Sequence, residues 1–197
     1  MKIGVLASQG AFAEHIAILK ELGAEAVAVR LPEELKGLDG LIIPGGESTT
    51  ISKLMSHYKL SHEIQRLAKK GLPIWGTCAG MIMLADKLPG STVEPLGLMR
   101  ISVKRNAFGR QKESFETELA IPALGKKPFP AVFIRAPAIQ ETMDGAETLA
   151  KLDDGTIVAA RQGKLLATAF HPELTDDHRF HEYFLDIIAK EQKSRKK

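Results

Sequence analysis

The sequence predicts an α/β protein in which a mostly parallel central sheet has helices on both faces and carries a mixed or antiparallel extension. In the first half, short and wholly apolar runs alternate with segments of helical periodicity, which is typical of parallel strands buried between helices. After Gly97, strand-like segments follow one another with few helices between them. The 197 residues, 44% of them hydrophobic, fit one compact domain over residues 1–197.

The elements of the first half follow from this periodicity. Residues 2–7 are expected to form a strand, and residues 12–22 a helix that ends at Gly23, because glycine is a frequent helix stop. The apolar side chains at helical spacing are Phe12, Ile16, Leu19 and Leu22. The other elements expected in this half are strands over residues 25–30, 41–44 and 73–76 and a helix over residues 61–70.

Strands dominate the expected second half, where prolines at positions 122, 128, 130 and 137 separate several of them. The expected strands cover residues 98–104, 114–121, 131–135, 148–152, 156–161 and 165–170. A helix over residues 178–190 follows. The basic residues 191–197 are expected to form a solvated, frayed tail, since cations at a helix C-terminus complement its dipole.

Bulk properties exclude several classes of protein. The net charge of +3 is too small to indicate a nucleic-acid-binding surface. No apolar stretch approaches the roughly 20 residues needed to cross a bilayer, and the first apolar run ends at Ser8, too early for a secretory signal. One cysteine forms no internal disulfide, which fits a reducing compartment. We therefore expect a cytoplasmic protein that binds neither nucleic acid nor membrane.

Cys78, the only cysteine, has the sequence context of a catalytic nucleophile. It lies in Gly76-Thr77-Cys78-Ala79-Gly80, directly after an apolar strand-like run and directly before a helix-like segment. Strand, tight turn, nucleophile and helix form a nucleophile elbow, and the small neighbours let the backbone bend sharply. The N-terminus of the following helix favours a thiolate. The alternative, a small buried hydrophobic side chain, is the usual role of a lone cysteine.

His171 is the best candidate for the base that a cysteine nucleophile needs. It follows an expected strand, where open α/β sheets build their sites, and Pro172 keeps it out of the helical region. In extended chain Glu173 points the same way as His171, so its carboxylate can fix the imidazole tautomer. The other histidines are less suitable. His15, His57 and His62 are expected at the surface, and His178 and His181 lack the further ligands of a metal site.

A glycine-containing loop, Pro44-Gly45-Gly46-Glu47-Ser48, follows another apolar strand and opens a helix. Its amides can approach a ligand closely, so the N–H groups of Gly46 and Ala79 are candidates for an oxyanion hole. A phosphate-binding loop is the alternative, but the Walker lysine and the spaced glycines of a dinucleotide site are missing.

Together and in this order, these segments resemble the triad-type glutamine amidotransferases. The likeness covers nearly the whole chain and is greatest to the glutaminase subunits of pyridoxal 5′-phosphate synthases. Besides the segments above, it rests on Leu6-Ala7-Ser8-Gln9-Gly10-Ala11-Phe12 with Glu14-His15, Arg105-Asn106 with Phe108-Gly109-Arg110-Gln111, Ser114-Phe115, Phe133-Ile134-Arg135-Ala136-Pro137, and Phe170-His171-Pro172-Glu173-Leu174. Two positions depart from the pattern. Ile82 stands where many amidotransferases have glutamine, but it agrees with the vitamin B6 subfamily. Ser8 stands where a leucine is expected.

The resemblance implies a three-layer, flavodoxin-like class I amidotransferase fold and hydrolysis of L-glutamine to L-glutamate and ammonia through a thioester. Cys78, His171 and Glu173 are the implied triad. The implied glutamine-binding residues are Gly46, Glu47, Ser48, Arg105, Ile134 and Arg135. The implied partner is a TIM-barrel synthase subunit, bound in a large equimolar complex near Gln9 and Gly10. The glutaminase is expected to be nearly silent until docked and to need no cofactor or metal, since pyridoxal 5′-phosphate is the product made on the partner.

Three alternatives remain at this point. The glutaminase subunit of imidazole glycerol phosphate synthase is similar in length, but the segments around Arg105 and Arg135 argue against it. A glutamine-binding regulatory module that has lost catalysis has no need of an intact Cys78, His171 and Glu173. A stress-response or chaperone protein of related fold with a reactive cysteine does not require the His-Pro-Glu segment.

Overall fold

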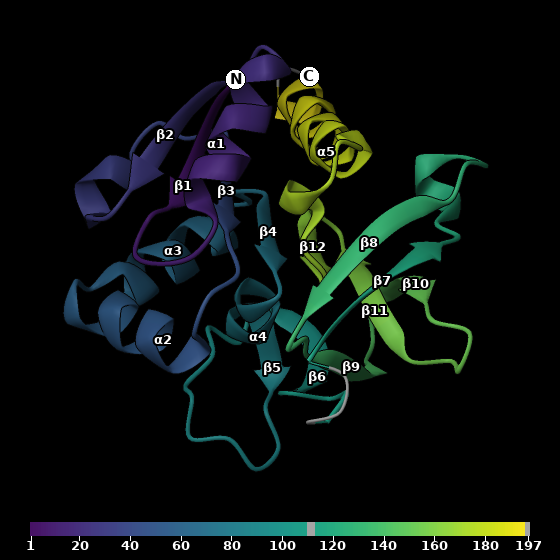
Figure 1. Cartoon of the computed structure of the whole chain (residues 1–197). Helices are drawn as coiled ribbons and strands as arrows, with labels where there is room; N and C mark the ends of the chain where they lie inside the picture. The colour runs from purple at the N-terminus through teal and green to yellow at the C-terminus, as the bar shows by residue number, and fades with distance from the viewer. Residues whose placement is uncertain (110–112, 196–197) are drawn as a thin grey trace.

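The computed structural model describes residues 1–109 and 113–195. Arg110 and Gln111, which belong to the amidotransferase-like pattern, and residues 196–197 of the expected tail lie outside the described residues. The described chain forms a large mixed sheet with helices on both faces and a separate two-stranded sheet beside it (Figure 1). The α/β class expected from the sequence is therefore confirmed.

Five parallel strands form the half of the sheet expected from the sequence, in the order β2-β1-β3-β4-β12. This is the strand order of flavodoxin-like folds. Every residue of β3 and β4 is buried, as expected of parallel strands covered on both faces. The bounds are β1 (Lys2–Leu6), β2 (Glu25–Val29), β3 (Gly40–Ile43), β4 (Ile74–Thr77) and β12 (Leu165–Thr168).

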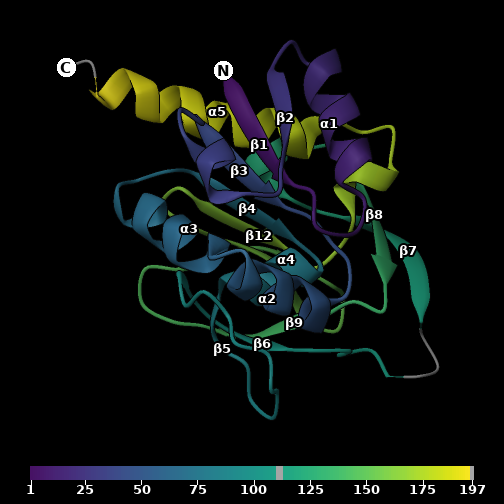
Figure 2. The ribbon, with the colours of Figure 1, turned by 90° about the vertical axis from the view of Figure 1, so that its left-hand side faces the viewer.

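Helices cover this parallel half in two layers. Helices α1 and α5 lie on one face, and α2, α3 and α4 lie on the other (Figures 1 and 2). Trp75 of β4 is fully buried and packs against Phe180 and Phe184 of α5, so the largest side chain of the sheet ties the last helix to its centre. The helices are α1 (Phe12–Glu21), α2 (Ser48–His57), α3 (Leu60–Lys69), α4 (Ala79–Leu84) and α5 (Arg179–Arg195). Short 3-10 helices are η1 (Pro32–Leu35), η2 (Pro122–Leu124) and η3 (Pro172–Leu174).

Beyond β12 the sheet continues in the mixed manner that the sequence predicts, in the order β12-β11-β9-β6-β5, with β10 paired to β11. β11 pairs antiparallel with β12 and β9, and β9 pairs antiparallel with β6. β5 and β6 pair parallel to each other. Two of these strands, β5 and β9, are absent from the sequence prediction. The bounds are β5 (Ala85–Lys87), β6 (Met99–Lys104), β9 (Ala138–Thr142), β10 (Glu147–Lys151) and β11 (Ile157–Gln162).

The strands expected over residues 114–121 and 131–135 do not join the main sheet. They pair with each other as β7 (Ser114–Leu119) and β8 (Phe129–Ile134), and stand apart from it at the right of Figure 2. β8 includes Pro130. Both strands of a two-stranded sheet are edge strands, and an edge strand tolerates a proline, which has no N–H to donate. The aromatic rings of Phe115 and Phe133 stack across the pair with centroids 4.6 Å apart.

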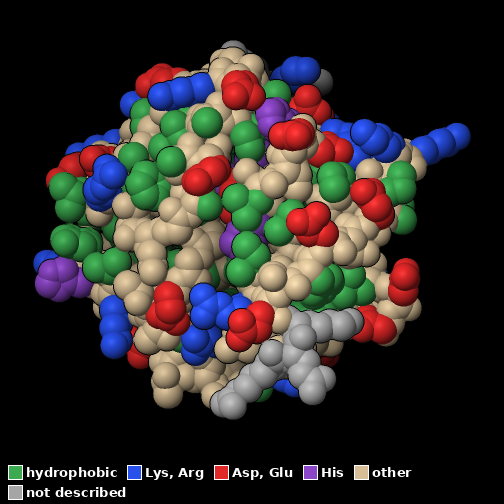
Figure 3. Space-filling model, in the orientation of Figure 1, with side chains coloured by type: hydrophobic (Ala, Val, Ile, Leu, Met, Phe, Trp, Pro, Cys, Tyr) green, Lys and Arg blue, Asp and Glu red, His purple; other side chains and the backbone are tan. Residues whose placement is uncertain are grey.

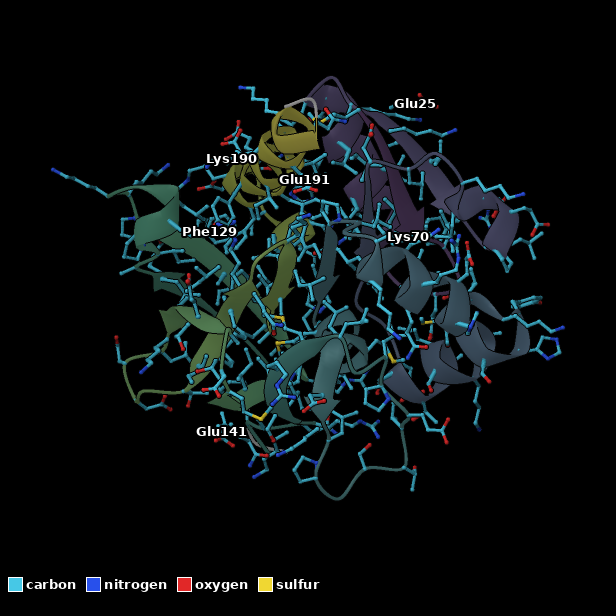
Figure 4. The ribbon with its side chains drawn as sticks, turned by 180° about the vertical axis from the view of Figure 1, so that it is seen from behind. Glu25, Lys70, Phe129, Glu141, Lys190 and Glu191 are labelled. Carbon is cyan, nitrogen blue, oxygen red and sulfur yellow. The ribbon has the colours of Figure 1, made fainter. Side chains whose placement is uncertain are left out.

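Helix α5 extends to Arg195 and so includes part of the tail that we expected to be frayed. An ion pair between Lys164 Nζ and Glu191 Oε1, 2.5 Å long, ties this part of α5 to the turn before β12. Figure 4 labels Glu191 on this helix beside Lys190. Within residues 1–109 and 113–195, no helix has both the length and the apolar character to cross a membrane.

Close backbone packing sets the position of α4 beneath the strand ends. A Cβ atom added to Gly80 would lie 1.8 Å from the carbonyl oxygen of Ile43 in β3. The added Cβ atom and the Ile43 carbonyl oxygen are both fixed to the backbone and cannot turn away from each other. Only glycine therefore allows α4 to approach β3 this closely. The position of the helix fixes that of Cys78, which immediately precedes it.

Gly80→Ala is expected to lower the free energy of unfolding by about 1–3 kcal/mol, the usual cost of overpacking. Urea denaturation of the purified protein measures this quantity. Gly40→Ala is the matched control, because there the nearest atoms to the new methyl group belong to the side chains of Ile188 and Phe184 and not to the backbone. Equal losses in the two variants would contradict the backbone argument.

Candidate active site

Cys78 occupies the turn between β4 and α4, in the strained conformation of a nucleophile elbow. Its backbone angles are φ 48° and ψ −105°, in a region that residues other than glycine rarely adopt. The Cys78 N–H donates to the carbonyl oxygen of Thr168 in β12 at 2.8 Å. The surrounding structure thus holds a strained residue in place, as it does at many functional sites, and the sulfur atom lies beside the carboxyl end of the sheet.

His171 lies beside Cys78, since both side chains line the same cleft and both contact Gly45. Its own backbone N–H donates to Val132 in β8 at 2.8 Å. The imidazole Nδ1 lies 2.7 Å from Oε1 of Glu173. The geometry of this pair differs from the sequence expectation, since Pro172–Leu174 forms a 3-10 turn instead of an extended chain. The carboxylate still reaches the ring, because one tight turn brings residues two apart close together.

The pKa of His171 reflects these contacts. Burial lowers the pKa, but the hydrogen bonds to Cys78 and Glu173 and the negative charges of both groups outweigh burial and raise it to about 10. With a pKa of about 10 the imidazole carries a proton at neutral pH, next to the side chain of Cys78. Such a cation stabilises the thiolate, which is the reactive form of cysteine.

The second carboxylate oxygen of Glu173 faces a histidine from another element. Glu173 Oε2 lies 3.3 Å from Nε2 of His15, and both side chains have no exposed surface. His15 Nδ1 lies 2.8 Å from Nε2 of His181 in α5. The expectation that His15 is a surface residue is therefore wrong. The sequence contained a signal, because position 15 falls on the same face of the helix as Phe12, Ile16 and Leu19.

Both of these histidines are held neutral. Burial lowers the pKa of His15 well below its usual value, and the charges of His181 and His171 lower it further. Burial, with a smaller contribution from His178, lowers the pKa of His181 to about 3. A buried neutral imidazole presents one N–H donor and one lone pair, so the pair can form a directional chain of hydrogen bonds behind Glu173.

The glycine loop between β3 and α2 packs directly on Cys78 and His171. A Cβ atom on Gly45 would lie 2.4 Å from His171 Cε1 and 3.3 Å from Cys78 Cβ. The Gly45 N–H donates to Thr77 Oγ1 at 3.1 Å, a role for Thr77 that sequence reasoning missed. Gly46 has φ 153°, in the range that favours glycine. The loop therefore closes over the two reactive side chains, with its backbone in van der Waals contact.

Gln9 and Gly10 hold the same loop from the other side. The Glu47 N–H donates to Gln9 Oε1 at 3.2 Å. Gly10 approaches so closely that a Cβ atom there would overlap the Gly45 carbonyl oxygen. These two residues, expected at the partner interface, thus also shape the loop that carries Gly46.

An open cleft of about 650 Å³ lies over these groups, a volume typical of small-molecule sites. Figure 3 shows a hollow near the centre of this face, with a histidine in it and hydrophobic side chains beside it. Of the site residues predicted from the sequence, all except Glu173 line the cleft, and Glu173 lies behind His171. The lining predicted residues are Gln9, Gly10, Gly46, Glu47, Ser48, Cys78, Ala79, Arg105, Ile134, Arg135 and His171.

Further residues line the cleft without having been assigned a role from the sequence: Ile82, Asn106, Phe108, Gly109, Glu113, Ala136 and Pro137. Most of them belong to segments that carried the family resemblance. The histidines at positions 57 and 62 are exposed. His178 pairs with Glu21 at 3.9 Å, whereas His181 points inward, so these two do not share a ligand site. No cluster suited to a metal ion is found among the described residues.

Charged side chains at the rim of the cleft form a small network. The Glu47 carboxylate caps helix α2 by accepting the N–H groups of Thr49 and Thr50. Partial burial raises the pKa of Glu47, but these hydrogen bonds outweigh it and lower the pKa. The Arg105 guanidinium lies 3.4 Å from the same carboxylate. A cation and an anion therefore stand side by side where a ligand enters.

Ile134 and Arg135 form the opposite wall. The Ile134 carbonyl oxygen lies 3.9 Å from Cys78 Sγ, and its side chain is 38% exposed, unusual for isoleucine. Arg135 has φ 42° and ends β8 in a left-handed conformation. This strained conformation changes the direction of the chain after β8, at the rim of the cleft. Such strain is common beside functional sites.

Comparison with known proteins gives a consistent result. The model of the SNO glutamine amidotransferase family matches residues 5–190. The chain is 63% identical over 189 residues to a pyridoxal 5′-phosphate synthase subunit PdxT of Dehalococcoides mccartyi, covering 95% of this chain and 97% of the relative. It is 61% identical over 190 residues to the PdxT of Herpetosiphon aurantiacus, covering 95% of this chain and all of the relative.

Solved structures agree with these relatives. A crystal structure of a glutamine amidotransferase superposes with a TM-score of 0.90 at 49% identity, covering 95% of this chain and 98% of that chain. A chain of the PurLQS structure from Thermotoga maritima superposes with a TM-score of 0.69 at 16% identity, covering 94% and 97%. The second likeness concerns the fold alone.

The buried neutral histidines predict sensitivity to acid. Below a pH of about 6.5 the unfolded chain binds protons at His15 and His181 that the folded chain does not bind. Since the unfolded state then holds more protons, the free energy of unfolding falls as the pH falls, by up to about 1.4 kcal/mol per pH unit for each group. For His181 this continues to about pH 3.

His181→Phe removes one of these groups and keeps an aromatic ring against Trp75. Its free energy of unfolding should therefore fall less steeply than that of the original protein between pH 7 and 5, measured by urea denaturation. His57→Gln changes an exposed histidine and is the control. An unchanged slope in His181→Phe would contradict the prediction.

Proposed function

The chain belongs to the SNO glutamine amidotransferase family, and on this premise we propose that it is the glutamine-hydrolysing subunit of a pyridoxal 5′-phosphate synthase. It converts L-glutamine to L-glutamate and ammonia and passes the ammonia to a synthase subunit. The relatives that match almost end to end are subunits of that synthase. The observation that supports the chemistry is that Cys78 and a His171 held by Glu173 line the same open cleft.

In the first half of the reaction, the Cys78 thiolate attacks the side-chain amide carbon of glutamine. A bond forms between Sγ and carbon, and the carbonyl electrons move onto oxygen. The C–N bond then breaks as His171 donates its proton to nitrogen, and ammonia leaves. The product on the enzyme is a thioester of the glutamyl group. His171 can act as this acid because Glu173 stabilises its cationic form.

In the second half, water attacks the thioester carbon. His171, now neutral, takes a proton from that water, and the bond between carbon and Sγ breaks. Glutamate leaves, and the original pair of thiolate and imidazolium is restored. Each protonation change is confined to one ring nitrogen, because the other is held by Glu173 at 2.7 Å.

Backbone N–H groups of Gly46 and Ala79 are proposed to bind the oxyanion that forms in each half. Ala79 is the first residue of α4, where N–H groups have no partner in a preceding helical turn. Gly46 lines the same cleft from the loop above. Each donor of this kind typically lowers the barrier by about 3 kcal/mol.

Glutamine itself is proposed to bind through Gly46, Glu47, Ser48, Arg105, Ile134 and Arg135. A guanidinium suits the α-carboxylate, and a carboxylate suits the α-ammonium. Glu47 and Arg105 lie 3.4 Å apart at the rim, so one zwitterionic substrate head group fits both. Glu47 keeps its helix-capping contacts at the same time, which fixes the position of its charge.

The acceptor chemistry belongs on another polypeptide. Free ammonia is protonated in neutral water and is then no nucleophile, so a synthetic enzyme gains from a covered transfer. We propose a TIM-barrel synthase subunit as the partner, in an equimolar complex that contacts the side of Gln9 and Gly10. Because Gln9 holds Glu47 of the oxyanion loop, docking there can change glutamine turnover. An unpaired reactive thiol also favours a reducing, cytoplasmic location.

Glutamate release from L-glutamine by the purified chain, alone and with a stoichiometric synthase subunit, tests this proposal. We expect strong stimulation by the synthase and no release by Cys78→Ala in either condition, because that variant has no nucleophile. Circular dichroism should show an unchanged fold. Turnover by Cys78→Ala would end the assignment of the nucleophile, and bound but unhydrolysed glutamine in the original protein would favour a regulatory role.

Arg105→Gln tests the substrate head-group site. Loss of a charge-assisted hydrogen bond of about 1.5–3 kcal/mol should lower kcat/KM for glutamine roughly 10- to 150-fold, mainly through KM. Arg100→Gln, which changes an exposed arginine of β6, is the matched control. If the two variants have the same KM, Arg105 does not bind the α-carboxylate.

A further inference from the structure

Two buried histidines behind the triad have no part in the mechanism above. His15 comes from α1 and His181 from α5, and neither has exposed surface. They continue the line of polar contacts that starts at Cys78 and runs through His171 and Glu173. Both rings also pack edge-on against Trp75, with centroids 5.6 and 4.9 Å away. Packing against Trp75 in the core therefore fixes the orientation of both rings.

The carboxylate of Glu173 explains why such groups are needed. Its side chain has no exposed surface, yet its charge supports the imidazolium of His171. A buried carboxylate is costly unless donors reach both oxygens. Glu173 Oε1 lies 2.7 Å from His171 Nδ1, which is its hydrogen-bond partner. Among the described residues Oε2 has no hydrogen bond of good geometry, and the nearby donor is His15 Nε2 at 3.3 Å.

The nearby carboxylate favours one arrangement of the ring protons. If His15 carried its proton on Nδ1, its Nε2 lone pair would face the carboxylate oxygen, and two electron-rich atoms would repel each other. With the proton on Nε2, His15 donates to Glu173. Its Nδ1 must then accept, and the atom 2.8 Å away is His181 Nε2, which therefore carries a proton. His181 Nδ1, which has no partner among the described residues, is then a lone pair and not a stranded donor.

Thr77 is the other polar group beside His15, with Oγ1 3.5 Å from Nε2. The Thr77 hydroxyl already accepts the Gly45 N–H at 3.1 Å. The hydroxyl can accept from a protonated His15 Nε2 or donate to an unprotonated one, but at 3.5 Å either hydrogen bond is long, and the hydroxyl carries no charge. The carboxylate is therefore the stronger acceptor, and the direction of the chain of hydrogen bonds is unchanged.

We propose that His15 and His181 are positioning residues of the catalytic centre, in which His181 Nε2–H donates to His15 Nδ1 and His15 Nε2–H donates to Glu173 Oε2. His15 holds the carboxylate so that Oε1 stays on His171. His181 fixes the tautomer of His15. This inference rests on the proposed function for its effect on turnover, whereas the arrangement of protons does not depend on it.

The protons can be observed directly. In the protein labelled with ¹⁵N-histidine, the ring nitrogen resonances distinguish the Nε2–H tautomer, the Nδ1–H tautomer and the cation. We expect both His15 and His181 to be neutral Nε2–H tautomers at pH 7. Their signals are assigned from the variants His15→Gln and His181→Gln. A proton on Nδ1 of His15, or a cationic His15, would overturn the proposal whatever the activity of the enzyme.

Kinetics with the synthase subunit test the effect on turnover. His15→Leu removes both the donor and the acceptor, and we expect kcat to fall about 10- to 100-fold, the usual effect of losing an orienting partner behind a ligand. KM for glutamine should stay the same, because His15 does not line the cleft. His15→Gln keeps one donor and one acceptor and should retain most of the original kcat.

His181→Phe and His181→Gln repeat the comparison one position further away. The phenylalanine variant should lose less kcat than His15→Leu, and the glutamine variant should restore it. His57→Gln, at an exposed position on α2, is the control for a histidine substitution. Equal kcat in His15→Leu and the original protein, or equal loss in His15→Leu and His15→Gln, overturns the positioning role. Absence of glutamate release by the original protein would instead count against the proposed function.

Discussion

The hydrogen bond between His171 Nδ1 and Glu173 Oε1 is the interaction on which the arrangement of the centre depends. It stabilises a charged imidazole inside the protein, and it requires an ionised carboxylate with no exposed surface. Both demands are costly unless several elements contribute. β8 holds the His171 backbone through Val132, α1 supplies His15 to the far oxygen, and η3 provides the tight turn between acid and base. Elements remote in sequence are thereby constrained by one contact.

The parallel half of the sheet is what brings these elements together. The carboxyl ends of β3, β4 and β12 lead into the glycine loop, the nucleophile and the base, respectively. Ligands of open α/β folds bind at this edge, so three short connections are enough to assemble a site. Glycine keeps the pieces in contact. Gly80 lets α4 reach the Ile43 carbonyl, and Gly45 lets its loop rest on His171. Larger residues at these positions would move Cys78 away from His171.

Much of this could be predicted from sequence because the signals are local. Apolar runs identify buried strands, and the context of Cys78 and of His171 identifies strand ends. Long-range pairing is less accessible. The strand β9 follows Pro137 and has an exposed, polar second half, so it becomes a strand only because β6 and β11 flank it. β7 and β8 have ordinary strand patterns that do not reveal that they leave the main sheet. The helix face on which His15 lies indicates that it is buried, but its role is recognisable only once its partner, Glu173, is placed beside it.

The position of β12 in the sheet has a consequence for how the protein reaches its native state. β12 is the last strand in sequence, yet it lies between β4 and β11, and residues 78–164 separate it from β4. While the chain emerges from the ribosome, β4 has an unpaired edge until that late segment arrives, and such edges invite association with other chains. The last strand to pair is therefore a central strand of the sheet and not an edge strand. Pairing between strands that are far apart in sequence is slow. The same event places His171 beside Cys78, so an incomplete nascent chain lacks the pairing on which the proposed reaction depends.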